Sequence, residues 1–355
     1  MLITGGLGSI GRACVPRLLA RGCEIRVLDA LEPSVHGPDA EIEDYRRAFD
    51  AGDALAVSRG SVADRALLAA QLEGVDAVLH LAALVSVPGS MRDSAAYVEA
   101  NVTGTARLAD LLGERPGVAR VVLASSRAVY GEGPYGCPAG CPSPGPWERG
   151  LEALARAAWT PTCPACGAGL TPLPADEGIP PHPVSVYGVT KLAQERLLEM
   201  SQARHAADLV VFRLQNVYGP GLSRAVPDVG VANILAQRVL AGETLRLFED
   251  GGQLRDFVLM DDVADLLVAA TLGERRAARF DLANVGFGTS HTLRELAERL
   301  FDAAGVPRRI EISGEYRVGD VRHCVADTAR LAKTWSWSPT PLDEGVARLL
   351  RWLQR

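Results

Sequence analysis

The residues whose types and spacing could do chemistry are a serine, a tyrosine and a lysine in the middle of the chain. Ser126 follows the apolar run Arg120–Ala124, and Tyr187 and Lys191 are four residues apart in a helical pattern. Residues at that spacing share one helix face, and a nearby ammonium lowers the pKa of a phenol until tyrosine can act as a base near neutrality. A serine at the end of a parallel strand lies where such sheets bind ligands, although it could equally be a cap. We predict that Ser126, Tyr187 and Lys191 are catalytic.

Lysine scarcity makes this pattern more specific than its spacing alone. Of the 37 basic residues, only Lys191 and Lys333 are lysines. A chance match to Y-x-x-x-K is therefore uncommon in this chain. A tyrosine base needs a compact ammonium rather than a planar guanidinium, whereas Lys333 is expected to be a surface residue.

A glycine-rich loop near the N-terminus predicts a dinucleotide site. Gly5, Gly8 and Gly11 follow a short strand and open a helix, and Asp29 ends the next strand, 18 residues after Gly11. Glycine lets the backbone approach a pyrophosphate at the helix N-terminus, and a carboxylate at the second strand accepts hydrogen bonds from the adenosine ribose. Because that carboxylate repels a 2′-phosphate, we predict NAD rather than NADP. The alternative is a tight turn followed by an ordinary aspartate.

The elements that must position these residues alternate between strands and helices. Strands are predicted at 1–4, 24–28, 55–58, 77–81, 120–124 and 208–212, and helices at 10–21, 65–72, 97–112, 186–204, 231–241, 261–272, 292–304 and 342–353. Pro16 is expected to kink or shorten the first helix. Alternation of this kind predicts an α/β fold with a Rossmann-type, doubly wound parallel sheet. We assign 1–215 to an NAD-binding domain with a Cys-rich insert at about 132–183, and 216–355 mainly to a smaller α/β substrate lobe.

Composition excludes several classes of protein. The formal net charge is −6, and a net negative charge does not attract nucleic acid or an anionic membrane surface. Apolar runs are too short for a membrane span, and the N-terminus has no signal-peptide pattern. A cytoplasmic enzyme is expected.

Together these motifs resemble the extended short-chain dehydrogenase/reductase superfamily, and more narrowly its nucleotide-sugar epimerase/dehydratase branch. The resemblance rests on the glycine loop, Asp29, H-L-A-A at 80–83, S-S-R-A-V-Y-G at 125–131, Y-G-V-T-K at 187–191, R-L-Q-N-V-Y-G-P-G at 213–221 and G-G-Q-L-R-D-F-V at 251–258. It covers nearly the whole chain apart from the insert. His80 in the apolar H-L-A-A run is expected to lie beside the cofactor rather than act as a ligand or base.

The resemblance implies particular binding residues. Those expected at NAD are Gly5, Gly8, Ser9, Ile10, Gly11, Asp29, Ser61, Val62, Leu81, Ala82, Ala83, Tyr187 and Lys191. Those expected at a dTDP- or UDP-hexose are Ser86, Ser126, Asn216, Arg255 and Arg322. Ser61 stands where the family often has an aspartate that holds the adenine. The alternative role of Ser86 is that of a loop cap. Each arginine could instead be solvated or ion-paired. Members of this family usually form homodimers through the helices at 97–112 and 186–204.

The residues after Ser126 narrow the reaction that the resemblance implies. Dehydratases of this branch carry an Asp-Glu pair there and decarboxylases a nearby glutamate, whereas this chain has Arg127 and Ala128. We therefore predict epimerisation at C4 of a nucleotide-linked hexose through a transient 4-keto sugar. The alternatives are a nucleotide-sugar 4-ketoreductase or dehydrogenase, and a catalytically silent NAD- or redox-sensing module.

Four cysteines in the insert have the spacing of a metal site. They form C-x3-C and C-P-A-C-G pairs, and they are Cys137, Cys141, Cys163 and Cys166. Four thiolates make a closed tetrahedral zinc site, and a metal would order a segment rich in glycine and proline. We predict structural zinc; two disulfides, free thiols or a catalytic metal are the alternatives. An insert of this kind is similar to that of proteins assigned as dTDP-L-rhamnose 4-epimerases, which leaves dTDP-L-rhamnose, its epimer dTDP-6-deoxy-L-talose and UDP-hexoses as candidate substrates.

Overall fold

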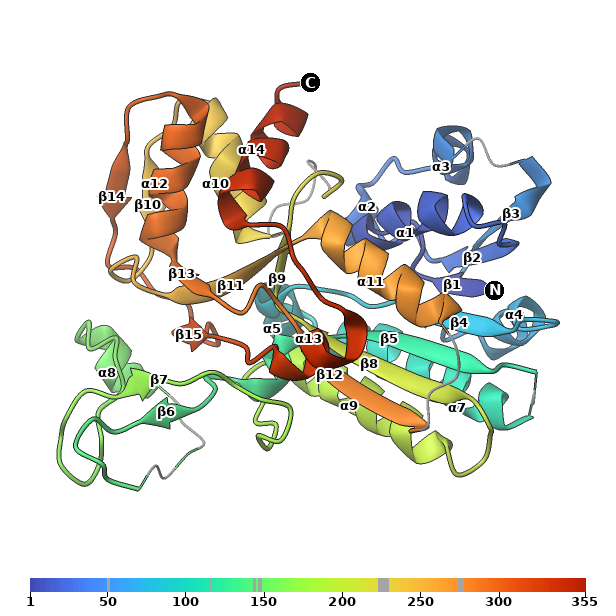
Figure 1. The fold of residues 1–355 in the computed structure, drawn as a ribbon, viewed down its shortest axis with the longest axis horizontal. Helices are drawn as coiled ribbons and strands as arrows, with labels where there is room; N and C mark the ends of the chain where they lie inside the picture. Colours follow the sequence, from blue (N-terminus) through green and yellow to red (C-terminus); the bar gives the residue numbers. More distant parts are fainter. Residues whose placement is uncertain (50–51, 115–116, 143–144, 146–148, 223–229, 274–277) are drawn as a thin grey trace.

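The computed structural model of the protein describes all residues except 50–51, 115–116, 143–144, 146–148, 223–229 and 274–277. A parallel sheet of seven strands forms the centre of the molecule (Figure 1). Its strands are β1 (Leu2–Thr4), β2 (Ile25–Asp29), β3 (Leu55–Arg59), β4 (Ala77–His80), β5 (Arg120–Ser126), β8 (Asp208–Leu214) and β12 (Phe280–Val285). They lie in the order β12-β8-β5-β4-β1-β2-β3, and every neighbouring pair is parallel. The strand order reverses between β1 and β4, where folds of this type bind ligands. The predicted Rossmann-type sheet is confirmed.

Helices cover both faces of this sheet, because strands buried on both sides need apolar partners above and below. One face packs against α1 (Ser9–Leu19), α11 (Met260–Leu272) and α13 (Ala329–Trp335). The other packs against α4 (Arg65–Gln71), α7 (Gly104–Glu114) and α9 (Val186–Ser201). Leu18 in α1 and Leu198 in α9 are buried, and each such side chain contributes about 1.5–3 kcal/mol of burial free energy.

Helix α9 ends at Ser201, three residues before its predicted end, and the first helix and the one predicted at 97–112 differ in form as well. Helix α1 continues through Pro16 and ends at Leu19, two residues before its predicted end. The predicted helix at 97–112 is built from α6 (Ser94–Tyr97), a π-helical segment Val98–Thr103 and α7. The π segment brings Asn101 into the interior, where it is fully buried.

Part of the central sheet comes from the second half of the chain. Strand β12 pairs with β8 along six residues, and α11 packs on α1 beneath the glycine loop. After residue 216 the chain therefore passes from the central sheet to the smaller lobe and returns to the sheet at β12. Assignment of separate functions to 1–215 and 216–355 stays a prediction.

The smaller lobe has its own strands, helices and apolar core. Its strands are β9 (Asn216–Tyr218), β11 (Leu254–Leu259), β13 (Ser290–Thr292) and β15 (His323–Cys324) in one sheet, and β10 (Leu245–Leu247) and β14 (Ile310–Ile312) in another. Helices α10 (Val231–Leu240), α12 (Leu293–Ala304) and α14 (Leu342–Leu353) pack on them around one cluster of buried residues. Helix α12 begins with a capping box between Thr292 and Glu295 and ends at Gly305 in the left-handed conformation, as its sequence favours.

The Cys-rich insert projects from the end of β5 beside the lobe, as the green segment of Figure 1 shows. It contains β6 (Tyr135–Gly136), β7 (Thr171–Pro172) and α8 (Leu151–Ala155), which is shorter than its helical pattern at 147–158; residues 147 and 148 lie outside the described part of the chain. Its small core is formed by Tyr135, Cys163 and Leu170. With so little secondary structure, the insert depends on side-chain contacts for its order.

Two short helices after β2 were not predicted. They are α2 (Pro33–His36), which has no buried residue, and α3 (Ile42–Phe49), whose Ile42, Tyr45 and Phe49 are partly buried against the core. Among the described helices, none has the length and apolar character needed to cross a membrane.

Candidate active site

A cavity of about 410 Å³ runs along the carboxyl ends of the central strands, and its volume is typical of a small-molecule site. Every residue predicted to contact NAD lines it: Gly5, Gly8, Ser9, Ile10, Gly11, Asp29, Ser61, Val62, Leu81, Ala82, Ala83, Tyr187 and Lys191. So do three predicted substrate residues, Ser86, Ser126 and Asn216. The topology thus brings segments from β1 to β9 to one surface.

The glycine loop is packed too closely to accept larger residues. Gly5 has φ +67°, and a Cβ there would lie 2.7 Å from the backbone of Ala82. A Cβ on Gly11 would lie 2.4 Å from the carbonyl oxygen of Gly6. The N-cap of α1 is Gly8, which has no side chain to cap the first amides. Those amides and the positive end of the helix dipole are therefore available to an anion such as a pyrophosphate.

Asp29 is held at the second strand end by two backbone amides. Its Oδ2 accepts from Leu7 N at 2.9 Å, and its Oδ1 accepts from Leu31 N at 2.9 Å. His36 lies 3.2 Å from Oδ1 through its Nε2, and its Nδ1 is 2.9 Å from the hydroxyl of Tyr45. His36 also lines the cavity. It was not predicted as a site residue, because α2, which carries it, has no apolar periodicity.

Ser126 and Tyr187 both line the cavity, and the Ser126 hydroxyl acts on the Tyr187 phenol to lower its pKa. Ser126 extends from the end of β5, where its Oγ also accepts from Ala128 N at 3.2 Å. Burial raises the pKa of Tyr187, and the Ser126 hydrogen bond and the charge of Arg127 oppose that rise. Ser185 caps the helix that carries Tyr187, accepting from Gly188 N at 3.1 Å.

Lys191 lies on the same helix but is directed toward the sheet. Its Nζ donates to Ala124 O and to Gln194 Oε1, each at 2.8 Å. Burial lowers its pKa to about 7, against the opposing charge of Glu195. In this arrangement the groups that favour the Tyr187 phenolate are therefore Ser126 and Arg127. The expected support from Lys191 stays a prediction.

His80 is a buried core residue at the end of β4. Its Nδ1 is 2.6 Å from the Thr4 hydroxyl and its Nε2 is 2.9 Å from the Thr105 hydroxyl. Burial and then the Lys191 charge lower its pKa to about 3. The neutral imidazole of His80 thus links the Thr4 and Thr105 hydroxyls at the end of β4.

Of the predicted substrate residues, the two outside the cavity are Arg255 and Arg322. Arg255 donates only to the backbone carbonyls of Leu254, Val321 and Arg322 among the described residues, and burial lowers its pKa to about 10. Arg322 forms ion pairs with Glu249 at 2.8 Å and Asp250 at 2.6 Å. The structure thus pairs Arg322 with one buried carboxylate, that of Glu249, and one exposed carboxylate, that of Asp250.

The predicted residues inside the cavity differ in how they are held. Ser86 caps α5 (Val87–Arg92) by accepting from Gly89 N at 3.0 Å, so it has the capping role while facing the cavity. Asn216 has a buried Oδ1 with no partner among the described residues. Ser61 accepts from Ala63 N at 3.1 Å.

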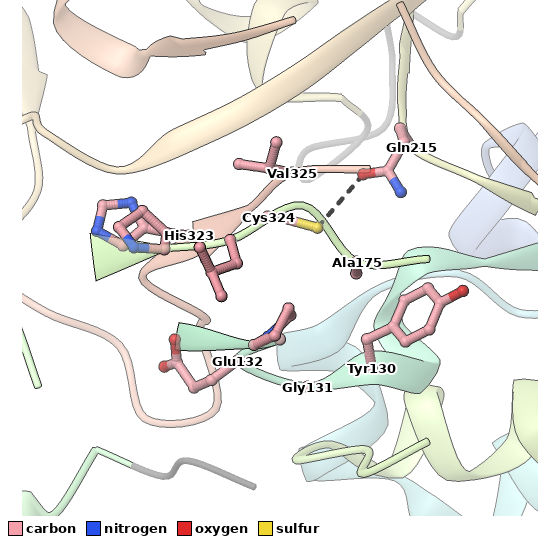
Figure 2. A pocket seen from close by; sticks show the side chains of 12 residues that line it. Tyr130, Gly131, Glu132, Ala175, Gln215, His323, Cys324 and Val325 are labelled. Carbon is pink, nitrogen blue, oxygen red and sulfur yellow. Dashed lines mark hydrogen bonds between the residues drawn. The ribbon is translucent and has the colours of Figure 1, made fainter. Parts of the chain in front are cut away.

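A second, small pocket separates the root of the insert from the main cavity. Figure 2 shows Glu132 and His323 on one side and Tyr130 on the other, with the Cys324 thiol donating to Gln215 Oε1 at 3.3 Å. Its volume is about 10 Å³, room for one water. Gln215 lines both pockets, so the insert root is only one side chain away from the main cavity.

The four cysteines of the insert converge on one point. The Sγ atoms of Cys137, Cys141, Cys163 and Cys166 all lie within 4.8 Å of one another, and none forms a disulfide. The turn between the second pair closes through Gly167 N donating to Cys163 O at 2.8 Å. The backbone amides of Cys141 and Ala139 lower the pKa of Cys137, which favours a thiolate there.

Comparison with known proteins agrees with this geometry. Residues 1–145 and 152–286 match the model of the NAD dependent epimerase/dehydratase family. The chain is 33% identical to the dTDP-L-rhamnose 4-epimerase of Burkholderia thailandensis, over 99% of this chain and 94% of that one. It is 31% identical to the UDP-glucose 4-epimerase of Mycolicibacterium smegmatis, over 99% and 98% of the two chains.

A solved structure extends the agreement to the backbone. The UDP-glucose 4-epimerase of Thermus thermophilus, in complex with NAD, superposes with a TM-score of 0.77 at 28% identity, over 99% of this chain and 98% of that one. The predicted resemblance is therefore confirmed, and the chain belongs to the NAD-dependent epimerase/dehydratase family.

Proposed function

We propose that this chain catalyses NAD-dependent epimerisation at C4 of a nucleotide-linked hexose. The observation that carries the proposal is that Ser126 and Tyr187 line the same cavity as the glycine loop and Asp29. The 4-epimerases among its relatives, which align over nearly its full length, support the same reaction. They also favour dTDP-L-rhamnose and UDP-glucose as the first substrates to try.

The cavity residues fit a bound dinucleotide. The uncapped amides of α1 face the pyrophosphate position, and Asp29 offers its remaining lone pairs to a ribose. Bound NAD would supply reversible hydride transfer at C4 of the sugar. The close contacts at Gly5 and Gly11 leave no room for side chains that would cover this surface.

The chain's own part in the reaction is to hold and move one proton. Tyr187 would take the proton of the C4 hydroxyl at its phenolic oxygen and later return it, while Ser126 donates to the sugar oxygen and fixes its position. Arg127 and Lys191 contribute the positive charge that favours the phenolate. Because Arg127 and Ala128 replace the carboxylates of dehydratases, the site lacks the further acid and base that elimination of water requires.

Substitution of Tyr187 tests this assignment. Tyr187→Phe removes the proton carrier and keeps the ring, so turnover should fall by at least about 100-fold while NAD and the sugar nucleotide still bind. Product formation is followed by NMR with dTDP-L-rhamnose and UDP-glucose. Turnover that survives the substitution would remove Tyr187 from the mechanism.

Coenzyme balance separates the proposal from its alternative. An epimerase forms product with no net change in absorbance at the reduced-nicotinamide band, whereas a 4-ketoreductase consumes reduced coenzyme in proportion to product. The replacement of the dehydratase carboxylates does not distinguish these two reactions. Stoichiometric loss of reduced coenzyme would therefore identify the ketoreductase.

We also propose that the four insert cysteines bind a structural zinc ion. Four sulfurs about 2.3 Å from a tetrahedral Zn²⁺ lie roughly 3.8 Å apart, and the Cys137 and Cys166 sulfurs are 3.5 Å apart. Metal analysis should give about one zinc per chain, and less than about 0.2 would reject the site. None of the described cysteines forms a disulfide, which fits the reducing cytoplasm that we propose as the location.

A homodimer is the proposed assembly. Val98 in the π segment and Val189 in α9 are 45% and 52% exposed, and the elements that carry them pack against each other. Two copies of this face would bury these side chains symmetrically. Light scattering should give a dimer mass, and Val189→Asp should shift it toward the monomer.

A further inference from the structure

Two of the three N–H groups of the Lys191 ammonium are already used in hydrogen bonds within the protein. An ammonium carries three N–H groups, and two of them are directed to Ala124 O and Gln194 Oε1 at 2.8 Å. Lys191 is 3% exposed and lines the cavity. One N–H therefore remains for a group in the cavity.

Gln194 is itself fixed from its other end. It is fully buried, and its Nε2 donates to the Thr105 hydroxyl at 2.7 Å. That hydroxyl donates to Asn101 O at 2.6 Å and is 2.9 Å from His80 Nε2. With its amide nitrogen donating to Thr105 in α7, Gln194 presents its oxygen to Lys191.

We propose that Gln194 is a positioning residue for the proposed reaction, whose side-chain oxygen orients the Lys191 ammonium so that one N–H faces the cofactor and Tyr187. The inference rests on the proposed function and names a further residue of that site. An amide does this without adding charge, so the ammonium keeps an acceptor but gains no ion-pair partner. The spacing of Lys191 and Gln194 on α9 allows this contact within one helix turn.

The charged groups around Lys191 show why an uncharged amide at Gln194 matters. Glu195 is the carboxylate that raises the Lys191 pKa, but it is committed to Arg213 at 2.7 Å and to the Ser125 hydroxyl at 2.5 Å. The titratable and charged groups that face this site are Tyr187 and Glu195 on α9, His80 on β4 and Arg213 on β8. Burial lowers the Lys191 pKa to about 7 and the His80 pKa to about 3. Lys191 is therefore the group expected to change charge near neutral pH.

The lysine content of the chain makes the test direct. Lys191 and Lys333 are its two lysines, so 13Cε-lysine labelling of the full chain with NAD gives two NMR signals, and the Lys333 signal serves as an internal reference. In Gln194→Glu a carboxylate replaces the amide at hydrogen-bond distance, which should raise the Lys191 titration midpoint by about 1–3 pH units. In Gln194→Leu the acceptor is lost, and the midpoint should fall. Gln354→Glu, an exposed site near the C-terminus, makes the same chemical change as a control and should leave it unchanged.

Activity provides a second readout. The alkaline limb of the kcat/KM profile should move up in Gln194→Glu and down in Gln194→Leu, by the same amounts as the NMR midpoints. A residue that merely supported packing would lower the melting temperature without moving either. If Gln194→Leu fails to fold, Gln194→Glu, which keeps the size, carries the test.

This design distinguishes failure of the Gln194 proposal from failure of the proposed reaction. In Gln194→Glu we expect the Lys191 titration midpoint to shift by at least about 1 pH unit. A midpoint within about 0.3 pH units of the native value would overturn the role of Gln194, even if the chain is an epimerase. Shifted midpoints in a chain that turns over no sugar nucleotide would keep Gln194 as the positioning residue of Lys191 and overturn the proposed reaction instead.

Discussion

The guanidinium of Arg149 and the carboxylate of Glu249 form a buried ion pair, 2.7 Å between Nη1 and Oε1, that joins the Cys-rich insert to the smaller lobe. Arg149 also donates to Glu132 Oε1 at 2.7 Å, and Glu249 also accepts from Arg322 at 2.8 Å. The second oxygen of Glu132 accepts from Arg322 N at 2.8 Å. The side chains of Arg149, Glu132 and Glu249 are each at most 4% exposed.

Removal of Arg149 should destabilise the protein strongly. Arg149→Met leaves Glu132 and Glu249 without a shared cation in a buried place, and breaking a buried pair in this way costs about 3–5 kcal/mol of unfolding free energy. Urea denaturation measures the loss. Arg156→Met, at an exposed position of the same insert, should change the unfolding free energy by less than about 0.5 kcal/mol. A loss below about 1 kcal/mol in Arg149→Met would mean that water screens the network as it does a surface pair.

Loss of the proposed zinc should unfold the insert rather than the sheet. Cys163 is 2% exposed and packs with Tyr135 and Leu170, and these few apolar contacts cannot replace four metal bonds. Cys163→Ser, or a chelator added to the native protein, should make residues 132–183 the first site of limited proteolysis. Cys23→Ser lies outside the cluster and should leave the cleavage pattern unchanged. An insert that resists protease after complete zinc removal would contradict the structural role.

The parts that were predictable from sequence are those fixed by local pattern. The glycine loop, Asp29 and the strand ends at Ala82 and Ser126 lie on elements whose order along the chain determines their place in a parallel sheet, and all of them line one cavity. Tyr187 and Lys191 were found from helix spacing. The same spacing would have indicated Gln194, three residues after Lys191, had buried polar partners been sought on that face.

The parts that were not predictable depend on distant pairing. Strand β12 joins β8 although about 70 residues separate them, and nothing in F-D-L-A-N-V indicates its neighbour. His36 is on a helix of four residues without apolar periodicity. The ion pairs of Arg322 with Glu249 and Asp250 join residues about 70 positions apart, which no local pattern indicates.

Replacement of Asp29 should weaken NAD and reduce discrimination against NADP. Asp29→Ala removes an acceptor for the ribose hydroxyls, and hydrogen bonds to a charged group contribute about 1.5–3 kcal/mol, so the Kd for NAD should rise about 10- to 100-fold. The Kd for NADP should rise less, because the repulsion of the 2′-phosphate also disappears. Calorimetric titration of both coenzymes measures this, with exposed Asp39→Ala as the control. Equal weakening of both coenzymes would show that Asp29 acts only by anchoring Leu7 and Leu31.

The buried imidazole of His80 should make stability depend on pH below neutrality. Burial and the Lys191 charge lower its pKa to about 3 in the folded protein, whereas an unfolded histidine titrates near about 6.5. Between these values the unfolded chain binds one more proton than the folded chain, so the unfolding free energy falls as pH falls, by up to about 1.4 kcal/mol per pH unit. From about pH 6.5 to about pH 5.0, the contribution of His80 amounts to about 1.5 kcal/mol.

His80→Gln should remove this contribution. Glutamine does not titrate and can still hydrogen-bond the Thr4 and Thr105 hydroxyls, so the variant should lose about 1.5 kcal/mol less than the native protein over the same pH range. Urea denaturation at both pH values gives the four free energies, and equal m-values show that the same structure unfolds in each case. If both proteins lose the same stability over this range, His80 is protonated in the folded state, and the hydrogen bonds to Thr4 and Thr105 must then be made by an imidazolium.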